Sequence, residues 1–549
     1  MHGQLLVNRG LRAPADARAF LNPEIGQLHD PFALTDMRSA VDILCSALRE
    51  RRRICVHGDF DVDGITSTAL LVRVLRMLGG DVTFFLPDRF TDGYGITVAN
   101  VDRIADSGSR VLIAADCGTT AISAVRRARE RGLQVLILDH HLPEDTLPEA
   151  SALVNPRRPD CRYPDPNLCT AGLAVKLLHG VLLAVNAARI DAFLRSLLKI
   201  AAIGTVADVV PLRGENRVIA SIGLRELARP ANAGLAALLR VAGLAGREIT
   251  EYDIAFRIAP RLNAIGRLAH AGPAVDMLLS DDADLVRVTA DAMERLNVKR
   301  QAIQGEVTEE AMSQVETRRR GPELPHGLVV HGRGWHRGVV GIVAAKLVER
   351  YHRPSLVLAV EGDQAQGSGR SIPGLNLVAA LRQCQHHLTR FGGHAMAVGL
   401  ALPVGAIDEF VETFELVLAQ LLPAGPEDQA LEADAAIELA EVDADLADFC
   451  SSLGPFGLGN SRPTFLAAGL RLTRPPRVAK DKHLRLWVGD GAGRELEAMA
   501  FGMASRQAEL DAAVGGFSAL FSVAWNVWAG RRSIQLQIGD FMAPSRGES

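Results

Sequence analysis

Short uncharged apolar runs alternate with amphipathic segments over the first part of the chain. The apolar runs are typical of buried strands and lie at residues 54–56, 82–87, 111–114 and 134–138. The amphipathic segments predict helices at 41–49, 65–78 and 121–131, and the last two end at glycines. This alternation over residues 41–215 predicts an α/β domain with a doubly wound, mostly parallel sheet.

The pattern changes twice further along the chain. A helical region is expected at about 168–245, a long charged helix at about 281–316, and a second α/β domain from 328–330 through a strand at 355–360 to a helix at 406–422. The last hundred residues contain five short β-like runs, at 465–472, 483–488, 495–500, 518–528 and 533–538. Five short strands predict an oligonucleotide-binding (OB) type β-barrel.

Proline- and glycine-rich or charged stretches divide the chain into six predicted parts. Residues 321–325 are the expected hinge, and the stretch 427–448 has nine acidic residues without lysine or arginine, which favours a solvated linker. The predicted parts are an N-terminal extension without an assigned role (1–40), the first α/β domain (41–280), a connecting helix (281–320), the second α/β domain (321–425), an acidic linker (426–452) and the barrel (453–549).

Composition narrows the class of protein. With 549 residues, 48% hydrophobic and 23% charged, the chain is expected to be soluble and to form several domains. Seven cysteines without a Cys-x-x-Cys pair favour reduced thiols in the cytoplasm and do not indicate zinc. We expect neither a membrane span nor a secretory signal. The net charge of −4 means that any nucleic-acid contact must be local.

Acidic and imidazole side chains collect at the ends of three predicted strands. His57, Asp59, Asp61 and Asp63 follow the first strand, Asp116 follows the third, and Asp139-His140-His141 follow the fourth. The carboxyl ends of parallel strands line the ligand crevice of an open sheet. Any one of these residues alone is an ordinary strand-end residue. Together with Asp208 they predict a site for magnesium or manganese.

The ligand types suit two divalent ions that share a bridging carboxylate. Asp61 and Asp63 are expected to reach different ions, with Asp116 as the bridge. His140 and Asp208 would complete the shell of the second ion, and His57 or Asp59 that of the first. The predicted metal ligands are therefore His57, Asp61, Asp63, Asp116, His140 and Asp208. His141, with Asp139 and Asp59, is expected to act in catalysis as a proton donor or charge stabiliser.

Nucleic-acid contacts are predicted from glycine-rich and basic segments. Gly392, Gly393 and His394 form an expected phosphate-binding turn, Arg370 and Ser371 lie in another glycine-rich loop, and His336 precedes a helix-like run. Seven basic residues against two acidic ones lie between 462 and 490, among them Arg474, Arg477, Lys480 and Lys482, and Trp487 lies in the same stretch. Cations and stacking rings suit single-stranded nucleic acid. The alternative is that the tryptophan rings fill the barrel core.

These motifs resemble the DHH phosphoesterase family, and within it the bacterial single-strand DNA exonucleases. His57-x3-Asp61-x-Asp63, Asp116, Asp139-His140-His141 and Asp208 match the four motifs of the family in order. Segments 335–344, 367–371 and 391–399 are similar to the DHH-associated domain. Segment 259–268 and the lead-in 453–460 are similar to the exonuclease branch, so the resemblance covers nearly the whole chain.

The resemblance implies a metal-dependent exonuclease that degrades single-stranded DNA from 5′ to 3′ into mononucleotides. It implies two manganese or magnesium ions, and a second domain that faces them across the DNA path. It also places Arg261, Asn263 and Arg267 near the substrate. Expected roles are recombination, mismatch repair and stalled-fork processing, with a single-strand-binding protein and a helicase as partners. A monomer is compatible with a single DNA-threading cleft.

Three alternatives remain open from the sequence. Another DHH phosphoesterase would act on pyrophosphate, oligoribonucleotides or cyclic dinucleotides, but such relatives usually lack a C-terminal barrel with basic residues. An inactive DNA-binding scaffold would be marked by the loss of a metal ligand, and all are present here. A module that only binds single strands leaves the four clusters of acids and histidines unexplained.

Overall fold

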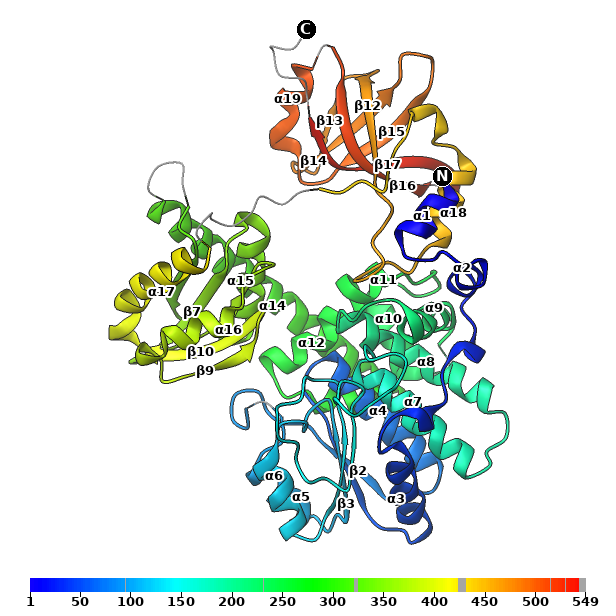
Figure 1. Cartoon of the computed structure of the whole chain (residues 1–549), viewed down its shortest axis with the longest axis vertical. Coiled ribbons are helices and arrows are strands. Elements are labelled where there is room, and N and C mark those ends of the chain that lie inside the picture. The colour runs from blue at the N-terminus through cyan, green and yellow to red at the C-terminus, as the bar shows by residue number, and fades with distance from the viewer. Residues whose placement is uncertain are drawn as a thin grey trace. The chain divides into compact units, whose positions relative to one another are not determined.

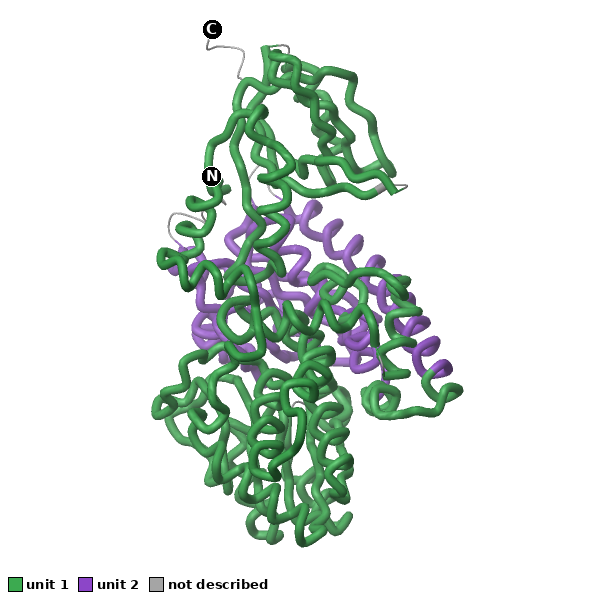
Figure 2. The backbone as a smooth tube through the Cα atoms, turned by 90° about the vertical axis from the view of Figure 1, so that its right-hand side faces the viewer, with its two compact units in different colours: residues 1–259, 271–286, 431–549 green, residues 260–270, 287–430 purple. Residues whose placement is uncertain are grey.

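The structure is a computed structural model that describes residues 1–93, 95–230, 232–319, 324–422, 431–513, 515–528 and 530–542. It contains two compact units (Figure 2). Unit 1 comprises Met1–Ala259, Ala271–Val286 and Leu431–Ser549, and unit 2 comprises Pro260–His270 and Arg287–Ala430. The described part of the chain has no helix of the length and apolarity needed to cross a membrane.

The first sheet of unit 1 is entirely parallel. Its strands are β1 (Ile54–His57), β2 (Val82–Phe85), β3 (Val111–Ala115), β4 (Gln134–Leu138) and β5 (Ala152–Val154). They lie in the order β2-β1-β3-β4-β5. The direction of winding therefore reverses between β1 and β3, and such a switch point is where open α/β sheets bind their ligands.

Helices cover both faces of this sheet (Figure 1). On one face α5 (Val98–Asp106) and α6 (Ile122–Glu130) bury apolar side chains such as Val101 and Val125 against Leu112 and Val135. On the other lie α3 (Met37–Arg49), α4 (Val62–Met77) and α7 (Thr170–Ala184), and α8 (Ile190–Ala207) packs on α4 and α7. The predicted doubly wound α/β fold is confirmed.

Further helices lie along this part of the chain, and all belong to unit 1 except the helix over 259–268, most of which belongs to unit 2. They are η1 (Ile25–Gln27), η2 (Pro31–Ala33), α9 (Gly214–Leu227), α10 (Ala233–Val241), α11 (Glu251–Asp253), the π-helical turn η3 (Ile254–Ile258), α12 (Ala259–Leu268) and α13 (Gly272–Leu279). The predicted long charged helix is α14, Ala283–Arg318. Residues 321–323 of the expected hinge, and residues 423–426, lie outside the described part of the chain.

Unit 2 contains a second α/β fold. Its strands are β6 (Leu328–Arg333), β7 (Ser355–Glu361), β8 (Gln364–Arg370), β9 (Arg390–His394) and β10 (Ala397–Pro403), in the order β6-β7-β8-β10-β9. Only the β6–β7 pair is parallel. The other helices of the unit are α15 (Arg337–Tyr351), α16 (Leu377–Gln383), η4 (Gln385–His387), η5 (Val404–Ala406) and α17 (Ile407–Leu421).

Two segments of unit 2 that the sequence predicts as loops belong to strands in the structure. The expected turn at residues 391–394 is the edge strand β9, because these residues pair with β10, and the tight turn comes after His394. Arg370, expected in a loop, is the last residue of β8 and pairs with Ala397 and Ser355. Glycine suits both strands because neighbouring backbone lies close. A Cβ on Gly393 would lie 2.3 Å from the oxygen of Ala397.

We call residues 431–542 the ring domain. Its sheet runs β11 (Ala435–Ala436), β12 (Phe465–Leu472), β16 (Phe517–Trp528), β17 (Arg531–Met542), β15 (Glu495–Ala500), β14 (His483–Gly489) and β13 (Arg477–Ala479). An additional pairing of β12 with β14 closes a ring of strands around Phe465, Leu486 and Phe521. All five predicted β-runs coincide with strands of this ring.

The stretch predicted as an acidic linker contains regular structure where it is described. It holds β11, η6 (Leu439–Glu441) and α18 (Ala444–Ser452), and α18 packs against β16. In the same domain, η7 (Ala504–Arg506) precedes α19 (Gln507–Asp511).

The N-terminal extension, for which the sequence predicts no role, ties the ring domain to the helices of unit 1. It forms α1 (His2–Asn8) and α2 (Pro14–Leu21), and Leu5 is fully buried in the core of the ring domain. The buried Arg9 donates to Asn460 Oδ1 at 3.1 Å and to the oxygen of Ser461 at 2.7 Å. From α9, Arg217 donates to backbone oxygens of Phe20, Leu453 and Gly454.

Candidate metal centre

The predicted acids and histidines of unit 1 meet where β1, β3 and β4 end. Asp59 lies between β1 and α4, Asp61 caps that helix by accepting the N–H of Gly64 at 3.1 Å, and Asp63 lies in its first turn. Asp116 directly follows β3 with a φ of 64°, a left-handed conformation that turns its side chain out of the strand. Asp139, His140 and His141 directly follow β4.

Three groups of potential metal ligands form at this edge, each with its ligand atoms within 4.8 Å of one another. The groups are Asp59, Asp61 and Asp116; Asp63, His140 and Asp208; and Asp116, His140 and His141. Asp116 and His140 each belong to two groups, and Asp61 and Asp63 belong to different ones. The structure thus brings together eight of the nine predicted metal and catalytic residues, counting Asp139 through its contact with His141.

His140 lies at the middle of the cluster. Its Nε2 is 3.5 Å from Asp116 Oδ1, 3.5 Å from Asp208 Oδ2 and 3.9 Å from Asp63 Oδ2. Asp208 comes from a distant part of the chain, because it is the C-terminal cap residue of α8. Three elements therefore place oxygen ligands around one imidazole.

The first turn of α7 fixes two of the carboxylates. Asp63 accepts the backbone N–H groups of Thr170 and Ala171, each at 2.7 Å, one on either oxygen. The hydroxyl of Thr170 donates to Asp116 Oδ1 at 2.9 Å. Backbone amides at a helix N-terminus favour an anion both by hydrogen bonding and through the helix dipole. Thr170 is a positioning residue that sequence reasoning missed, because a neutral threonine far along the chain carries no local signal.

His141 is held by Asp139. Its Nδ1 donates to Asp139 Oδ1 at 2.7 Å, and the other carboxylate oxygen accepts the N–H of Thr119 at 3.0 Å. Burial alone lowers the pKa of His141, but the hydrogen bond and charge of Asp139 outweigh it and raise this pKa to about 9. Burial likewise raises the pKa of Asp139, and His141 reverses that shift to below the ordinary value. The pair is therefore ionised at neutral pH.

The carboxyl groups of the cluster differ in acidity. Burial, with the charge of Asp116, raises the pKa of Asp61 to about 7 and that of Asp63 well above its usual range. Burial raises the pKa of Asp208 to about 6, although the charge of His140 opposes the shift. For Asp116 burial acts in the same direction, but the hydrogen bond and charge of His140 bring the pKa below its ordinary value.

Several buried polar atoms of the cluster have no hydrogen-bond partner among the described residues, namely His57 Nε2, Asp59 Oδ1, His140 Nδ1 and Asp208 Oδ2. Buried polar atoms are normally paired, so such a concentration marks a place where a ligand belongs. Carboxylate oxygens with one or two imidazoles are the donors that magnesium and manganese prefer. The residues present therefore fit divalent cations.

His57 is the predicted ligand that joins none of the three groups. It is fully buried, its Nδ1 is 3.6 Å from Cys117 Sγ, and its ring stacks on Phe85 at 5.3 Å. Burial lowers its pKa to about 4, so the ring is neutral. Of the two alternatives for the first ion, His57 or Asp59, the geometry favours Asp59.

Arg89, which the sequence analysis did not single out, lies next to the carboxylates of Asp59 and Asp61. Its guanidinium lies over the ring of Phe60, 4.9 Å from the centroid. Burial lowers the pKa of Arg89, and the charges of Asp59 and Asp61 oppose that shift. No local sequence pattern revealed it, because Arg89 is a single arginine after the edge strand β2, outside the motifs that carry the cluster.

The nucleic-acid-binding residues predicted for unit 2 lie on separate elements. In α12, Arg261 pairs with Glu294 at 2.5 Å, Asn263 is half-buried, and Arg267 donates to the oxygen of Gly338 at 3.1 Å. His336 caps α15 by accepting the N–H of Gly338.

On the sheet of unit 2, the predicted residues differ in exposure. The hydroxyl of the buried Ser371 donates to the oxygen of Leu375, and Arg370 donates to its neighbour Gly369. Gly392, Gly393 and His394 are exposed along the edge strand β9. A Cβ on Gly392 would meet nothing within 4 Å, so its backbone is open to a close approach.

The predicted basic residues of the ring domain gather around one tryptophan. Along β14, Leu484, Leu486 and Val488 face the core, so Trp487 lies on the outer face. The guanidinium groups of Arg485, Arg474 and Arg477 lie 5.0, 5.3 and 5.4 Å from the centre of its ring. Lys480 and Lys482 are exposed in the turn between β13 and β14. Trp525, in contrast, packs against the core and donates to Asp448.

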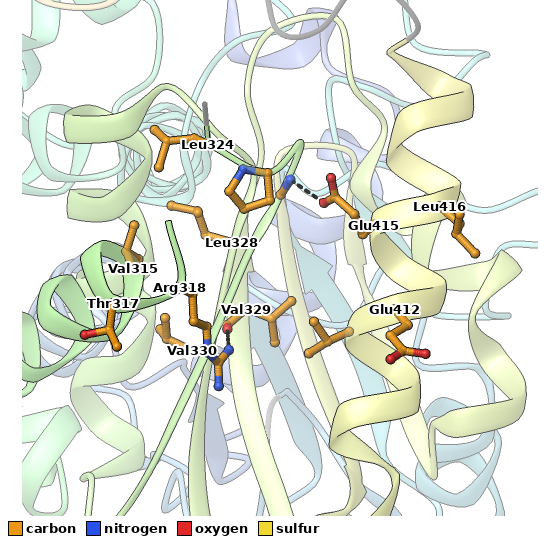
Figure 3. Close-up of a pocket in the computed structure, with 13 residues that line it drawn as sticks. Val315, Thr317, Arg318, Leu324, Leu328, Val329, Val330, Glu412, Glu415 and Leu416 are labelled. Atoms are coloured by element: carbon orange, nitrogen blue, oxygen red, sulfur yellow. Dashed lines mark hydrogen bonds between the residues drawn. The ribbon is translucent and has the colours of Figure 1, made fainter. Parts of the chain in front are cut away.

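Unit 2 also contains a pocket of about 900 Å³ at the end of α14, beside β6 and α17 (Figure 3). Apolar side chains such as Leu328, Val329 and Leu416 line it, and Arg318 donates to the oxygen of Val329 at 2.8 Å. None of the predicted site residues lines this pocket.

Three family models match the chain in succession. They are the DHH family, N-terminal domain, over residues 53–205, the DHHA1 domain over 325–420, and the RecJ OB domain over 433–540. The sequence is 35% identical to the single-stranded-DNA-specific exonuclease RecJ of Bacillus subtilis, a match that covers 98% of this chain and 67% of that protein. It is 36% identical to RecJ of Escherichia coli, over 92% of this chain and 90% of that protein.

The chain belongs to the RecJ family. The solved structure of RecJ from Thermus thermophilus in complex with Mn²⁺ is similar to it with a TM-score of 0.82 at 29% identity, over 99% of this chain and 76% of that one. A RecJ structure in complex with Mg²⁺ matches with a TM-score of 0.77. The expected DHH resemblance is thereby confirmed, and so are the two predicted α/β domains and the C-terminal OB domain.

Proposed function

We propose that this chain is a metal-dependent exonuclease that hydrolyses the phosphodiester bonds of single-stranded DNA. The observation that carries the proposal is the set of three ligand groups that share Asp116 and His140 at the switch point of the sheet. Membership of the RecJ family supports the substrate, and the Mn²⁺ and Mg²⁺ complexes of RecJ support manganese or magnesium as the cofactor.

The proposed ligands of one ion are Asp59, Asp61 and Asp116, and those of the other are Asp63, His140 and Asp208. When bound, a pair of divalent ions stabilises charge on the phosphoryl group and lowers the pKa of water. The protein keeps the ligands in place, since Asp63 is fixed by amides of α7 and Asp116 by the hydroxyl of Thr170. His57 is proposed as a buried neighbour of this set rather than a ligand.

His141 is the proposed proton donor or charge stabiliser at the scissile phosphate. Its pKa of about 9 keeps the ring cationic at neutral pH, and its Nδ1 is occupied by Asp139. The Nε2–H is the proposed donor to the substrate. Asp139 is proposed to act through His141, because its oxygens accept hydrogen bonds from His141 Nδ1 and the N–H groups of Thr119, His140 and His141.

The strand itself is proposed to contact three sets of residues. Arg261, Asn263 and Arg267 lie on α12, and His336, Arg370, Ser371, Gly392, Gly393 and His394 belong to the second α/β fold of unit 2. In the ring domain, Arg474, Arg477, Lys480 and Lys482 supply cations, while Trp487 supplies a stacking ring. Exposed glycines and cations of this kind bind the backbone without reading sequence.

The RecJ resemblance also suggests polarity and context. We propose digestion from 5′ to 3′ with release of mononucleotides, in recombination, mismatch repair and stalled-fork processing in the cytoplasm. A monomer acting with a single-strand-binding protein and a helicase completes the proposal. The complete set of acidic and imidazole ligands argues against an inactive scaffold.

The test is the degradation of a single-stranded DNA oligonucleotide in Mn²⁺, labelled at either its 5′ or its 3′ end. A duplex of the same sequence and the variant Asp116→Ala are the controls. We expect immediate release of the 5′ label as mononucleotide, with no cleavage of the duplex and none by the variant. DNA binding without cleavage by the native protein would contradict the proposal, as would cleavage of oligoribonucleotides or pyrophosphate alone.

A further inference from the structure

The segment after β5 is hydrogen-bonded to the loop that carries His141. The side-chain amide of Asn155 donates to the oxygen of His141 at 2.8 Å and to the hydroxyl of Thr119 at 3.0 Å. The carbonyl oxygen of the same side chain accepts the N–H of Arg157 at 2.8 Å. One buried asparagine therefore fixes both the His141 loop and the backbone of Arg157.

Arg157 and its neighbour Arg158 have very different surroundings. The guanidinium of Arg158 pairs with Asp36 and Asp160, each at 2.7 Å, and also donates to the oxygen of Leu153. The side chain of Arg157 is half-buried, yet its guanidinium has no hydrogen bond or ion pair with any residue that the structure describes. Within the part of the chain that the structure describes, none of the five N–H donors of Arg157 has a partner.

The charge of Arg157 reaches the metal centre. Burial raises the pKa of Asp208, and Arg157 is one of three cationic groups that oppose this shift, with His140 and His141. A partly buried guanidinium without an anionic partner is costly, since it has lost water and gained no hydrogen bond. Its planar fork matches two oxygens of a phosphate group.

We propose that Arg157 binds a phosphate group of the nucleic-acid strand at the metal centre, donating to its non-bridging oxygens. This inference rests on the proposed function for the identity of the phosphate. Neither the metal ligands nor His141 supplies such a planar pair of donors. Arg157 therefore holds the strand in register while the carboxylate cluster and His141 act on the bond that breaks.

The alternative is that Arg157 only balances the negative charge of Asp208 and does not contact the substrate. The two readings differ in salt dependence. A residue that binds a phosphate displaces counterions, so its removal reduces the slope of log affinity against log salt by about 0.7 for single strands. A counter-charge would leave this slope unchanged and would change the affinity for Mn²⁺ instead.

The experiment compares native protein with Arg157→Ala, Arg157→Lys and the matched control Arg158→Ala. Steady-state cleavage of oligothymidylate is measured in Mn²⁺ over a range of salt, together with Mn²⁺ affinity by calorimetry and thermal stability.

We expect Arg157→Ala to lower kcat/KM by about 10- to 100-fold and to flatten the salt slope, with Mn²⁺ affinity unchanged. Arg157→Lys should retain the slope but lose part of the rate, because it keeps the charge and loses the fork. Arg158→Ala should lower thermal stability and leave the slope unchanged.

Unchanged kcat/KM and slope in Arg157→Ala would overturn the inference, and so would a loss of Mn²⁺ affinity with an unchanged slope. If Arg157→Ala fails to fold, Arg157→Lys decides the matter, since a native rate in that variant contradicts phosphate binding through the fork. Should the native protein not cleave DNA, the proposed function fails on its own. Equilibrium binding of oligothymidylate in EDTA then still tests Arg157, through a weaker and less salt-dependent affinity in Arg157→Ala.

Discussion

The metal centre and the outer face of the ring domain are both charged sites, but they are built in opposite ways. In the metal centre Asp59, Asp63 and Asp116 are buried, and the last two are fixed by backbone amides or by a neighbouring hydroxyl. The arginines around Trp487 are exposed, and two of them, Arg474 and Arg485, form ion pairs with Glu495 and Glu497. A buried site fixes reacting groups, whereas an exposed one adapts to any base that stacks on it.

The two regions also differ in what burial does to charge. In the metal centre burial raises the pKa values of Asp59, Asp61, Asp63 and Asp208, so a bound cation favours the loss of their protons. On the ring domain the charges stand in solvent, where salt screens them. The first region should therefore respond to metal and pH, and the second to ionic strength.

Removing the hydroxyl of Thr170 should produce the largest effect, because it disturbs the fixed geometry of the metal centre. Thr170→Val keeps the shape of the side chain and loses the bond to Asp116 at 2.9 Å. We expect a loss of about 10- to 100-fold in Mn²⁺ affinity or in kcat, as for other residues that orient metal ligands. Calorimetry and single-turnover cleavage measure the two quantities.

The matched control is Thr308→Val, a buried threonine of α14 whose hydroxyl bonds the oxygen of Gln304. It should leave metal affinity and turnover at native values. Thr170→Ser should restore the native behaviour. Native kinetics in Thr170→Val would mean that the hydroxyl does not hold Asp116, and the contrast between a fixed and an adaptable region would lose its main support.

Truncating Trp487 should produce a smaller effect that is confined to binding. The ring is bracketed by Arg474, Arg477 and Arg485, and stacking on one base contributes about 1–3 kcal/mol. We expect Trp487→Ala to weaken binding of oligothymidylate by about tenfold and to leave kcat at saturating DNA unchanged. Fluorescence anisotropy and steady-state kinetics separate the two. Trp487→Phe should retain most of the affinity, and Leu466→Ala, another outward-facing residue, should retain all of it.

A change of pH should produce the smallest effect, and only at the metal centre. The pKa of Asp61 in the folded protein is about 7, above its ordinary value of 3.8, so without metal the folded state holds a proton that the unfolded state has lost between these values. Stability without metal therefore falls as pH rises through this window. Divalent ions bind the deprotonated carboxylates, so Mn²⁺ should raise the melting temperature more at about pH 8 than at about pH 5.5. Equal shifts at both pH values would contradict the assignment.

Local patterns predicted the sheet and most of the metal centre. Apolar runs that end in acids or histidines identify strand ends, and the rule that parallel strands gather their carboxyl ends places Asp61, Asp63, Asp116 and His140 together. Asp208 was predicted to join these residues only because its segment matches the fourth motif of the DHH family. It caps a helix and follows no strand, so the rule for parallel strands does not place it. His57 fits the pattern equally well, yet its ring packs on Phe85, which no local signal reveals.

Features that depend on strand pairing or on contacts between distant segments escaped prediction. The glycines at 392 and 393 form a strand because of their pairing with β10, whereas their composition favours a turn. Thr170, Asn155 and Arg157 are unremarkable in sequence and matter only because folding brings them to the cluster. Likewise Leu5 lies in the core of a domain more than four hundred residues away.

The most direct test of the account is anomalous diffraction from crystals grown with Mn²⁺. We predict two peaks at the carboxyl end of the first sheet, with Asp116 between them, one beside Asp59 and Asp61 and the other beside Asp63, His140 and Asp208. The Asp116→Ala variant should lose at least one peak. Absence of peaks at this edge, or a single ion bound away from Asp116, would contradict the proposed metal centre and the mechanism built on it.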